Sequence, residues 1–142
     1  MPLGLTPVLA TYSGQSASWS LENLNSAVAA YSGSTARLVF KYRGGSSFTG
    51  DLQLDAITLG GTTAGFEAGI DSYQTSTSTN GGTSTYSSVT SWTNLATSTI
   101  NGRWNRDAGS TPSSGTGNLG AYAGSYFVYA ETTGVGTPNK YF

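Results

Sequence analysis

The sequence predicts a single all-β domain, a jelly-roll-like antiparallel β-sandwich. Short segments of alternating apolar and polar residues recur along the 142 residues, and glycines separate them, as is typical of strands joined by turns. Ser, Thr and Gly make up 62 of the residues, which suits strands and turns better than long helices. Nine Tyr and three Trp supply the large apolar faces that a folded core needs and that a disordered chain of this polarity would lack.

The clearest strand covers residues 36–43. Alternate residues from Ala36 to Tyr42 are apolar and share one face, while the opposite face carries three basic residues. We expect this basic face to be solvated; the alternative is an edge strand that charge protects against unwanted pairing. Residues 51–59 are the expected partner strand, reached through Gly44-Gly45, and Gly60-Gly61 ends this hairpin.

Residues 18–31 leave two alternatives open. Ser18 to Asn23 alternate as a strand would, whereas Asn25 to Tyr31 suit a short helical turn packed through Val28. We favour a strand followed by a loop.

The second half of the chain holds three further strand signals. A Ser/Thr tract at 75–91 is interrupted by Asn80-Gly81-Gly82, which favours a hairpin; the alternative is a mobile loop. A strand pattern follows at 92–104, then a long loop of turn-forming residues at 104–117. The strongest signal is 125–131, with aromatic residues on both faces.

Both ends of the chain are predicted to be arms that flank a body formed by residues 11–133. Residues 1–10 contain Pro2 and Pro7, which argue for an extended N-terminal arm. Residues 134–142, within a tail predicted to be loop, form the C-terminal arm. We expect both arms to reach neighbouring subunits.

The composition removes several classes of function. The chain has no Cys and no His, which excludes thiolate nucleophiles, disulfides, imidazole catalysis and the common zinc sites. The six basic residues are scattered, so they form no basic patch that would bind nucleic acid. No apolar run is long enough to cross a membrane. Because the first basic residue is Arg37, we expect no secretory signal and a protein made in a cytoplasm. We therefore expect no enzyme, with no catalytic, cofactor-binding or metal-ligating residue assigned.

Asp51 and Asp55 are the first acidic pair to consider. Four residues apart on one strand, they share a face with Cα atoms about 13 Å apart at about 3.3 Å per residue. Glycosidase carboxylates lie about 5–9.5 Å apart. This pair is therefore expected to be solvated or to cap turns.

Arg103, Arg106 and Asp107 lie beside Trp104. Arg and Trp are favoured anchors of protein interfaces, so this group is a candidate contact surface. The alternative, which we favour, places Trp104 in the core and uses Arg106 to brace the loop that follows it through hydrogen bonds to carbonyls.

The tyrosines are a candidate sugar-stacking platform, although we expect most of them to fill the core or an oligomer interface. They are Tyr12, Tyr31, Tyr42, Tyr73, Tyr86, Tyr122, Tyr126, Tyr129 and Tyr141.

Several segments resemble the MAM domain in a permuted order. The family's N-terminal pattern is matched by Phe66-Glu67, by the stretch W-x-R-x-x-G-x-T-P-S-x-x-T-G from Trp104 to Gly117, and by Phe127, Tyr129 and Glu131. Its C-terminal pattern is matched earlier in the chain, by Ser13-Gly14-Gln15 with Trp19, by Phe40 and Tyr42, and by Gly50-Asp51, Leu54-Asp55 and Ile57. The resemblance covers most of the chain and implies a circularly permuted jelly-roll sandwich, with residues 60–65 bridging the family's usual ends.

The sequence departs from the family in its missing Cys and in about two strands without a counterpart. Open sheet edges would follow from the missing strands, so we expect another copy to cover them.

The resemblance also raises the question of a calcium site. If the turn at Gly60-Gly61 brings Asp55 and Glu67 together, they could bind Ca²⁺, as related jelly rolls do; the alternative is hydrogen bonding to loop amides.

MAM domains are adhesion and assembly modules, and MAM-like domains occur in bacteriophage head and tail proteins. The resemblance therefore implies a structural virion protein, a capsid decoration (cement) protein or a tail or fibre component, assembled in the host cytoplasm. Its expected partners are other copies of itself and other virion proteins, with no nucleic acid and no membrane. The alternative function is a glycan-binding or adhesion module for host attachment.

Overall fold

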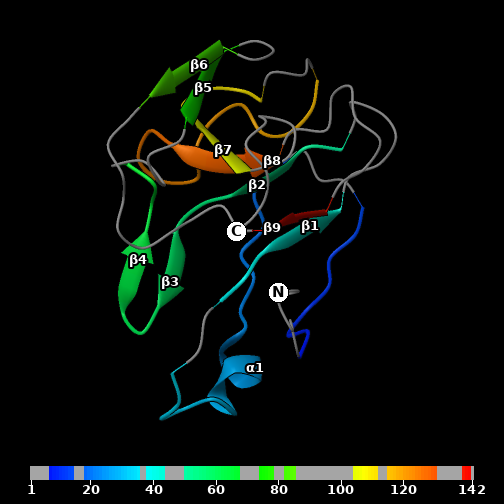
Figure 1. Cartoon of the computed structure of the whole chain (residues 1–142), viewed down its shortest axis with the longest axis vertical. Helices are drawn as coiled ribbons and strands as arrows, with labels where there is room; N and C mark the ends of the chain where they lie inside the picture. The colour runs from blue at the N-terminus through cyan, green and yellow to red at the C-terminus, as the bar shows by residue number, and fades with distance from the viewer. Residues whose placement is uncertain are drawn as a thin grey trace.

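The computed structural model describes residues 7–14, 18–35, 38–43, 50–67, 74–78, 82–85, 104–111, 115–130 and 139–141. In this part of the chain the protein is mostly strands with one short helix, which confirms the predicted all-β class (Figure 1). The elements are β1 (Lys41–Arg43), β2 (Leu52–Leu54), β3 (Ile57–Leu59), β4 (Thr62–Ala64), β5 (Gln74–Ser78), β6 (Gly82–Thr85), β7 (Trp104–Asp107), β8 (Phe127–Ala130), β9 (Asn139–Tyr141) and α1 (Asn25–Ala29). None of the helical segments in these ranges has the length and apolarity to cross a membrane.

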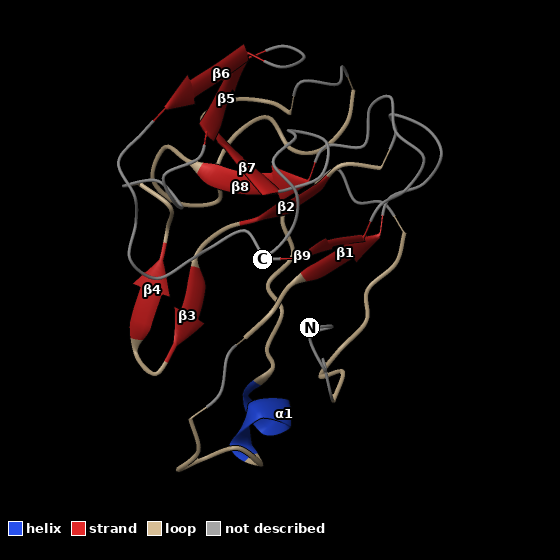
Figure 2. Ribbon diagram, viewed as in Figure 1, coloured by secondary structure: helices blue, strands red, loops and turns tan. Residues whose placement is uncertain are grey.

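Five strands form the central sheet, in the order β2-β8-β7-β5-β6 (Figure 2). Its pairs are antiparallel except β5 with β7, which run parallel and meet at Thr75 and Arg106. Two small antiparallel sheets accompany it, β1 with β9 and β3 with β4. The hairpin β5–β6 agrees with the prediction for 75–91, and β8 agrees with the strand predicted at 125–131.

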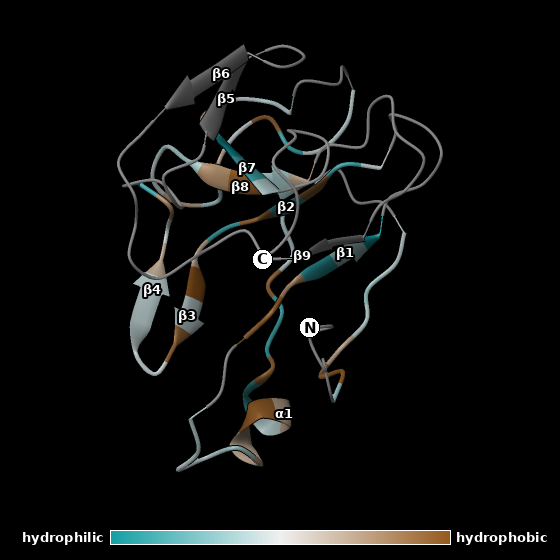
Figure 3. Ribbon diagram, in the orientation of Figure 1, coloured by the Kyte–Doolittle hydropathy of each residue, from teal (hydrophilic) through white to brown (hydrophobic). Residues whose placement is uncertain are grey.

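The largest apolar cluster lies on one face of the central sheet, and Phe127 and Tyr129 are fully buried on the other face. Trp104, Val128 and Ala130 are fully buried in this cluster, and Phe66 packs with them. Trp104 pairs with Ala130 across β7 and β8, so the two side chains share a face. The partly buried Phe40, Tyr42, Leu54, Ile57 and Ala64 close the cluster. Figure 3 shows this apolar character on β8 and β3.

The hairpin predicted between 36–43 and 51–59 is wrong. β1 pairs with β9 instead, and the second segment divides into β2, which pairs with β8, and β3, which pairs with β4. The division falls at Ala56, whose φ of +49° turns the chain out of the extended conformation. Gly60 and Gly61, both at positive φ, then turn β3 back onto β4. β9 also corrects the prediction that the whole tail is loop.

The strand favoured within 18–31 is wrong too, and the helical alternative is correct. α1 begins at Asn25, whose amide donates a hydrogen bond to Oδ1 of Asn23 at 3.0 Å. Leu21 is 86% exposed, so its alternation with Trp19 does not mark a buried strand face.

The loop predicted at 104–117 begins with a strand. β7 lies between β8 and β5, and all four of its residues are buried, polar ones included. Of the strand predicted at 92–104, only Trp104 lies in the part of the chain that the structure describes, and the arm residues 1–6, 134–138 and 142 lie outside it.

Candidate functional site

A row of polar side chains along β2 holds a glycine-rich segment, residues 115–126, which we call the braced loop. Asp51, Gln53 and Asp55 occupy alternate positions, so they project from the same face of the strand and its flanks. Gln53 contacts Asn118 twice: its Oε1 accepts from the Asn118 amide at 2.5 Å, and its Nε2 donates to the Asn118 carbonyl at 3.3 Å. Asp55 Oδ2 accepts from the amide of Ala123 at 3.0 Å.

Asp51 holds the start of the braced loop through hydroxyl groups. Its Oδ2 accepts from the Thr116 hydroxyl at 2.8 Å. The buried Thr111 hydroxyl lies 2.8 Å from both the carbonyl and the hydroxyl of Thr116. Together these bonds tie Thr111 and Asp51 to the start of the braced loop.

Glu67 holds the end of the braced loop. Its Oε1 accepts from the amides of Ser125 and Tyr126, each at 3.0 Å, immediately before β8 begins. A Cβ at Gly124 would lie 2.7 Å from Glu67 Cδ and nearer still to Oε1. The glycine is therefore required for this close approach, and its φ of +70° suits glycine as well.

These contacts decide between the two alternatives for Asp55 and Glu67 in favour of loop amides. Both carboxylates face backbone N–H donors of the braced loop, whereas Ca²⁺ would need carbonyl or carboxylate oxygens in those places. Among the residues that the structure describes, no group of three or more acidic side chains gathers as a metal site. Asp51 and Asp55 likewise hold different parts of the braced loop, as the turn-capping interpretation predicted.

Arg106 is a structural brace at the centre of the molecule. Only 7% of its surface is exposed, its Nε donates to the Phe66 carbonyl at 2.5 Å, and a terminal nitrogen donates to the Glu67 carbonyl at 2.6 Å. The guanidinium lies 3.3 Å from the centre of the Tyr126 ring, a cation–π contact. Trp104 and Arg106 are thus internal, as the favoured interpretation predicted, and they are not a contact surface. The carbonyls that Arg106 binds belong to Phe66 and Glu67, however, and not to the loop that follows it. Arg103 lies outside the described residues.

Asp107 is buried at the end of β7. Burial raises the pKa of its carboxyl, and hydrogen bonds from the amides of Ala108 and Gly109 partly oppose this effect. The Ala108 amide donates to Oδ1 at 2.7 Å. Oδ2 has no hydrogen-bond partner among the described ranges, which accounts for the direction of the change.

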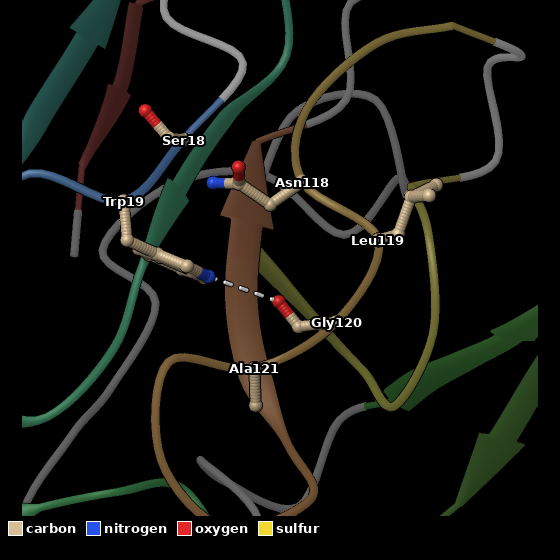
Figure 4. A pocket seen from close by; sticks show the side chains of 6 residues that line it. All are labelled: Ser18, Trp19, Asn118, Leu119, Gly120 and Ala121. Atoms are coloured by element: carbon tan, nitrogen blue, oxygen red, sulfur yellow. Dashed lines mark hydrogen bonds between the residues drawn. The ribbon is translucent and has the colours of Figure 1, made fainter.

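Beside the braced loop lies a shallow, open hollow of about 340 Å³ (Figure 4). It is lined by Ser18, Trp19, Asn118, Leu119, Gly120 and Ala121. The Trp19 indole N–H donates to the Gly120 carbonyl at 3.1 Å. The indole also packs edge-to-face against Tyr122 and Phe127, with ring centres 6.3 and 6.2 Å away.

The tyrosines divide between core and surface. Tyr129 is buried, Tyr31, Tyr42 and Tyr126 are half-buried, and Tyr12 and Tyr122 are exposed. Tyr73 and Tyr86 lie outside the described residues, and Tyr141 contributes its backbone to β9. Of these side chains, Tyr122 is the one that meets the hollow's Trp19.

Sequence reasoning missed Gln53, Asn118 and Gly120. The alternation of Asp51, Gln53 and Asp55 was a usable signal, because three polar side chains on one face of a strand need a polar neighbour. Nothing local in the sequence indicated that Trp19 would meet Gly120, 101 residues away.

Comparison with protein-family models, with curated proteins and with solved structures found no match for this chain.

Proposed function

We propose that this chain is a structural protein of a bacteriophage particle, a capsid decoration protein or a tail or fibre component, with a permuted MAM-like jelly-roll body. It works by burying surface against other copies of itself and against neighbouring virion proteins. The proposal involves no catalysis.

One observation carries the proposal: large apolar side chains stand exposed on segments that extend from the body. Val8, at the N-terminal end of the described chain, is 75% exposed, and Leu21, in the segment leading into α1, is 86% exposed. Leu59 is 55% exposed at the end of β3. Figure 1 shows α1 and the β3–β4 hairpin extending away from the central sheet. Contact with a neighbour would remove these side chains from water at about 25 cal/mol per Å² of apolar surface.

The use of the charged groups supports an assembly role. Asp51, Asp55 and Glu67 accept hydrogen bonds from the braced loop, and Arg106 is buried against carbonyls. These groups stabilise the fold, and because only 9% of the residues are charged, desolvating a contact surface costs less.

The residues behind the MAM resemblance support the proposed body. Trp104 lies in the core, Arg106 braces the turn at Phe66-Glu67, and Thr111 bonds to Thr116. Each of these motif residues therefore has a task in folding, as expected of a motif that defines a fold.

Electron microscopy of intact particles with a gold-labelled antibody against this chain tests the proposal. We expect gold at regular positions on the capsid or tail, and none after the antibody is pre-absorbed with purified protein. Recovery of the chain only as free protein in the host lysate, with unlabelled particles, would contradict it.

A further inference from the structure

The hollow beside the braced loop is built before any ligand arrives. Three contacts fix the Trp19 indole: the hydrogen bond to the Gly120 carbonyl and the edge-to-face packing against Tyr122 and Phe127. Phe127 is fully buried in β8, so the indole rests on a rigid element. A ligand that packs on this ring therefore does not have to order it.

The opposite wall presents an amide group. Gln53 binds both the N–H and the carbonyl of Asn118, which fixes the backbone there. Figure 4 shows the Asn118 side-chain amide directed toward the Ser18–Trp19 segment, with Leu119 on the far side of the hollow. An amide offers two donor hydrogens and an acceptor oxygen, so it can bond a pair of adjacent hydroxyl groups.

The lining also excludes some ligands. None of the six lining residues carries a charge, so nothing in the hollow compensates the desolvation of an ion. A purely apolar segment would cover the Asn118 amide without bonding to it, which costs free energy. The volume, about 340 Å³, lies at the small end of the range of about 300–1,000 Å³ for ligand sites.

We propose that this hollow binds a neutral carbohydrate ring. Such a ring combines a C–H face, which packs against the Trp19 ring, with hydroxyl groups, which bond to the Asn118 amide. Because the site is shallow, each site binds weakly, and repeated copies in an assembly would raise the avidity. The sugar site does not depend on the virion role, since a monomer would carry it equally.

The test is a nuclear magnetic resonance titration of the ¹⁵N-labelled protein with methyl glycosides of glucose, galactose and mannose and with N-acetylglucosamine. We expect at least one of them to shift both the Trp19 indole N–H and the Asn118 side-chain amide resonances. Asn118→Ala removes the amide without touching the backbone bonds to Gln53, and should weaken that binding at least tenfold. Asn23→Ala removes an amide beside α1 and should leave the binding unchanged.

Two further comparisons make the result decisive. Trp19→Phe keeps an aromatic ring but loses the indole N–H, and we expect it to weaken binding while the other amide resonances stay dispersed as in a folded protein. If no glycoside shifts either resonance, or if Asn118→Ala binds as tightly as the unmodified chain, the proposal is wrong. Tighter binding of 3′-sialyllactose than of lactose would overturn the assignment to neutral sugars.

Discussion

The most constrained charged residue is Arg106, because two carbonyl groups and an aromatic ring depend on its guanidinium. The Phe66 and Glu67 carbonyls both accept from it, and Tyr126 lies beneath it. Its fork of donors serves two carbonyls at once, which a lysine ammonium does with poorer geometry.

Replacing Arg106 should therefore destabilise the fold severely. Hydrogen bonds to charged groups contribute about 1.5–3 kcal/mol each, so Arg106→Ala should lower the free energy of unfolding by about 3 kcal/mol or more, and Arg106→Lys by less. Urea unfolding measures both. Arg43→Ala, on an exposed residue of β1, is the control and should stay within about 0.5 kcal/mol. Equal effects at the two arginines would contradict the bracing role.

Asp107 makes stability depend on pH in an unusual direction for a carboxylate. Its pKa in the folded protein is raised by burial, so between the ordinary value and the raised value the folded state binds more protons than the unfolded state. The group's contribution to stability is therefore present at low pH and is lost as pH rises through the raised pKa.

Asp107→Asn should remove this dependence. Its side-chain oxygen can still accept the Ala108 amide bond, and it carries no charge to desolvate. Thermal unfolding followed from acidic to neutral pH should show the variant gaining stability relative to the unmodified chain as pH rises. If the melting temperatures of the two proteins change with pH in parallel, burial of the charged Asp107 carboxylate does not lower the stability of the folded protein.

Among the elements, the braced loop accounts for most of the acidic side chains that the structure describes. Its first part is held by Asp51 and Gln53, and its last part by Asp55 and Glu67. This arrangement converts a glycine-rich segment into a fixed wall over one face of the central sheet.

Gly124→Ala tests how closely the braced loop approaches Glu67. Gly124 and Gly115 have similar φ values, +70° and +76°, so alanine at either position carries the left-handed penalty of about 1–2 kcal/mol. A Cβ at Gly115 meets no atom within 4 Å, whereas one at Gly124 collides with Glu67. Chemical denaturation should show a larger loss for Gly124→Ala. If Gly124→Ala and Gly115→Ala lower the free energy of unfolding by the same amount, Gly124 does not lie close to Glu67.

Ala56 is the opposite case, a residue whose replacement by glycine should stabilise the protein. Its φ of +49° places it in the left-handed region at the break between β2 and β3. Ala56→Gly should raise the free energy of unfolding by up to about 1 kcal/mol, because relief of strain exceeds the added flexibility of the unfolded chain. Calorimetry measures the melting temperature, which should rise. A lower melting temperature for Ala56→Gly would contradict the left-handed conformation of Ala56.

Elements were predictable from the sequence where the signal is local, and unpredictable where it is not. The hairpin β5–β6 follows from its turn residues, and β8 from its run of aromatic residues. The pairing of β1 with β9 does not follow from alternation, because alternation sets which face is buried and not which strand lies alongside. The polar residues Asn105, Arg106 and Asp107 predict a loop, yet pairing of β7 with a strand on each side buries them. The hollow could not be predicted either, because Trp19 and Gly120, on its two walls, are 101 residues apart in the sequence.

At the scale of the whole molecule, two charged side chains are buried in the central sheet while several large apolar side chains remain exposed to solvent. Arg106 and Asp107 are buried in β7, while Val8, Leu21 and Leu59 stand exposed on segments that extend from the body. These exposed apolar side chains, which contact with a neighbour would remove from water, are the physical basis of the proposed assembly role.

Sedimentation equilibrium of the purified chain at micromolar concentration tests this basis most directly, alongside the double variant Val8→Ser with Leu21→Ser. Leu119→Ser is the matched control, since Leu119 is 90% exposed but lies at the hollow. We predict an oligomer for the unmodified chain and for the control, and dissociation toward monomers for the double variant. An unmodified chain that remains monomeric throughout, indistinguishable from the double variant, would contradict the account.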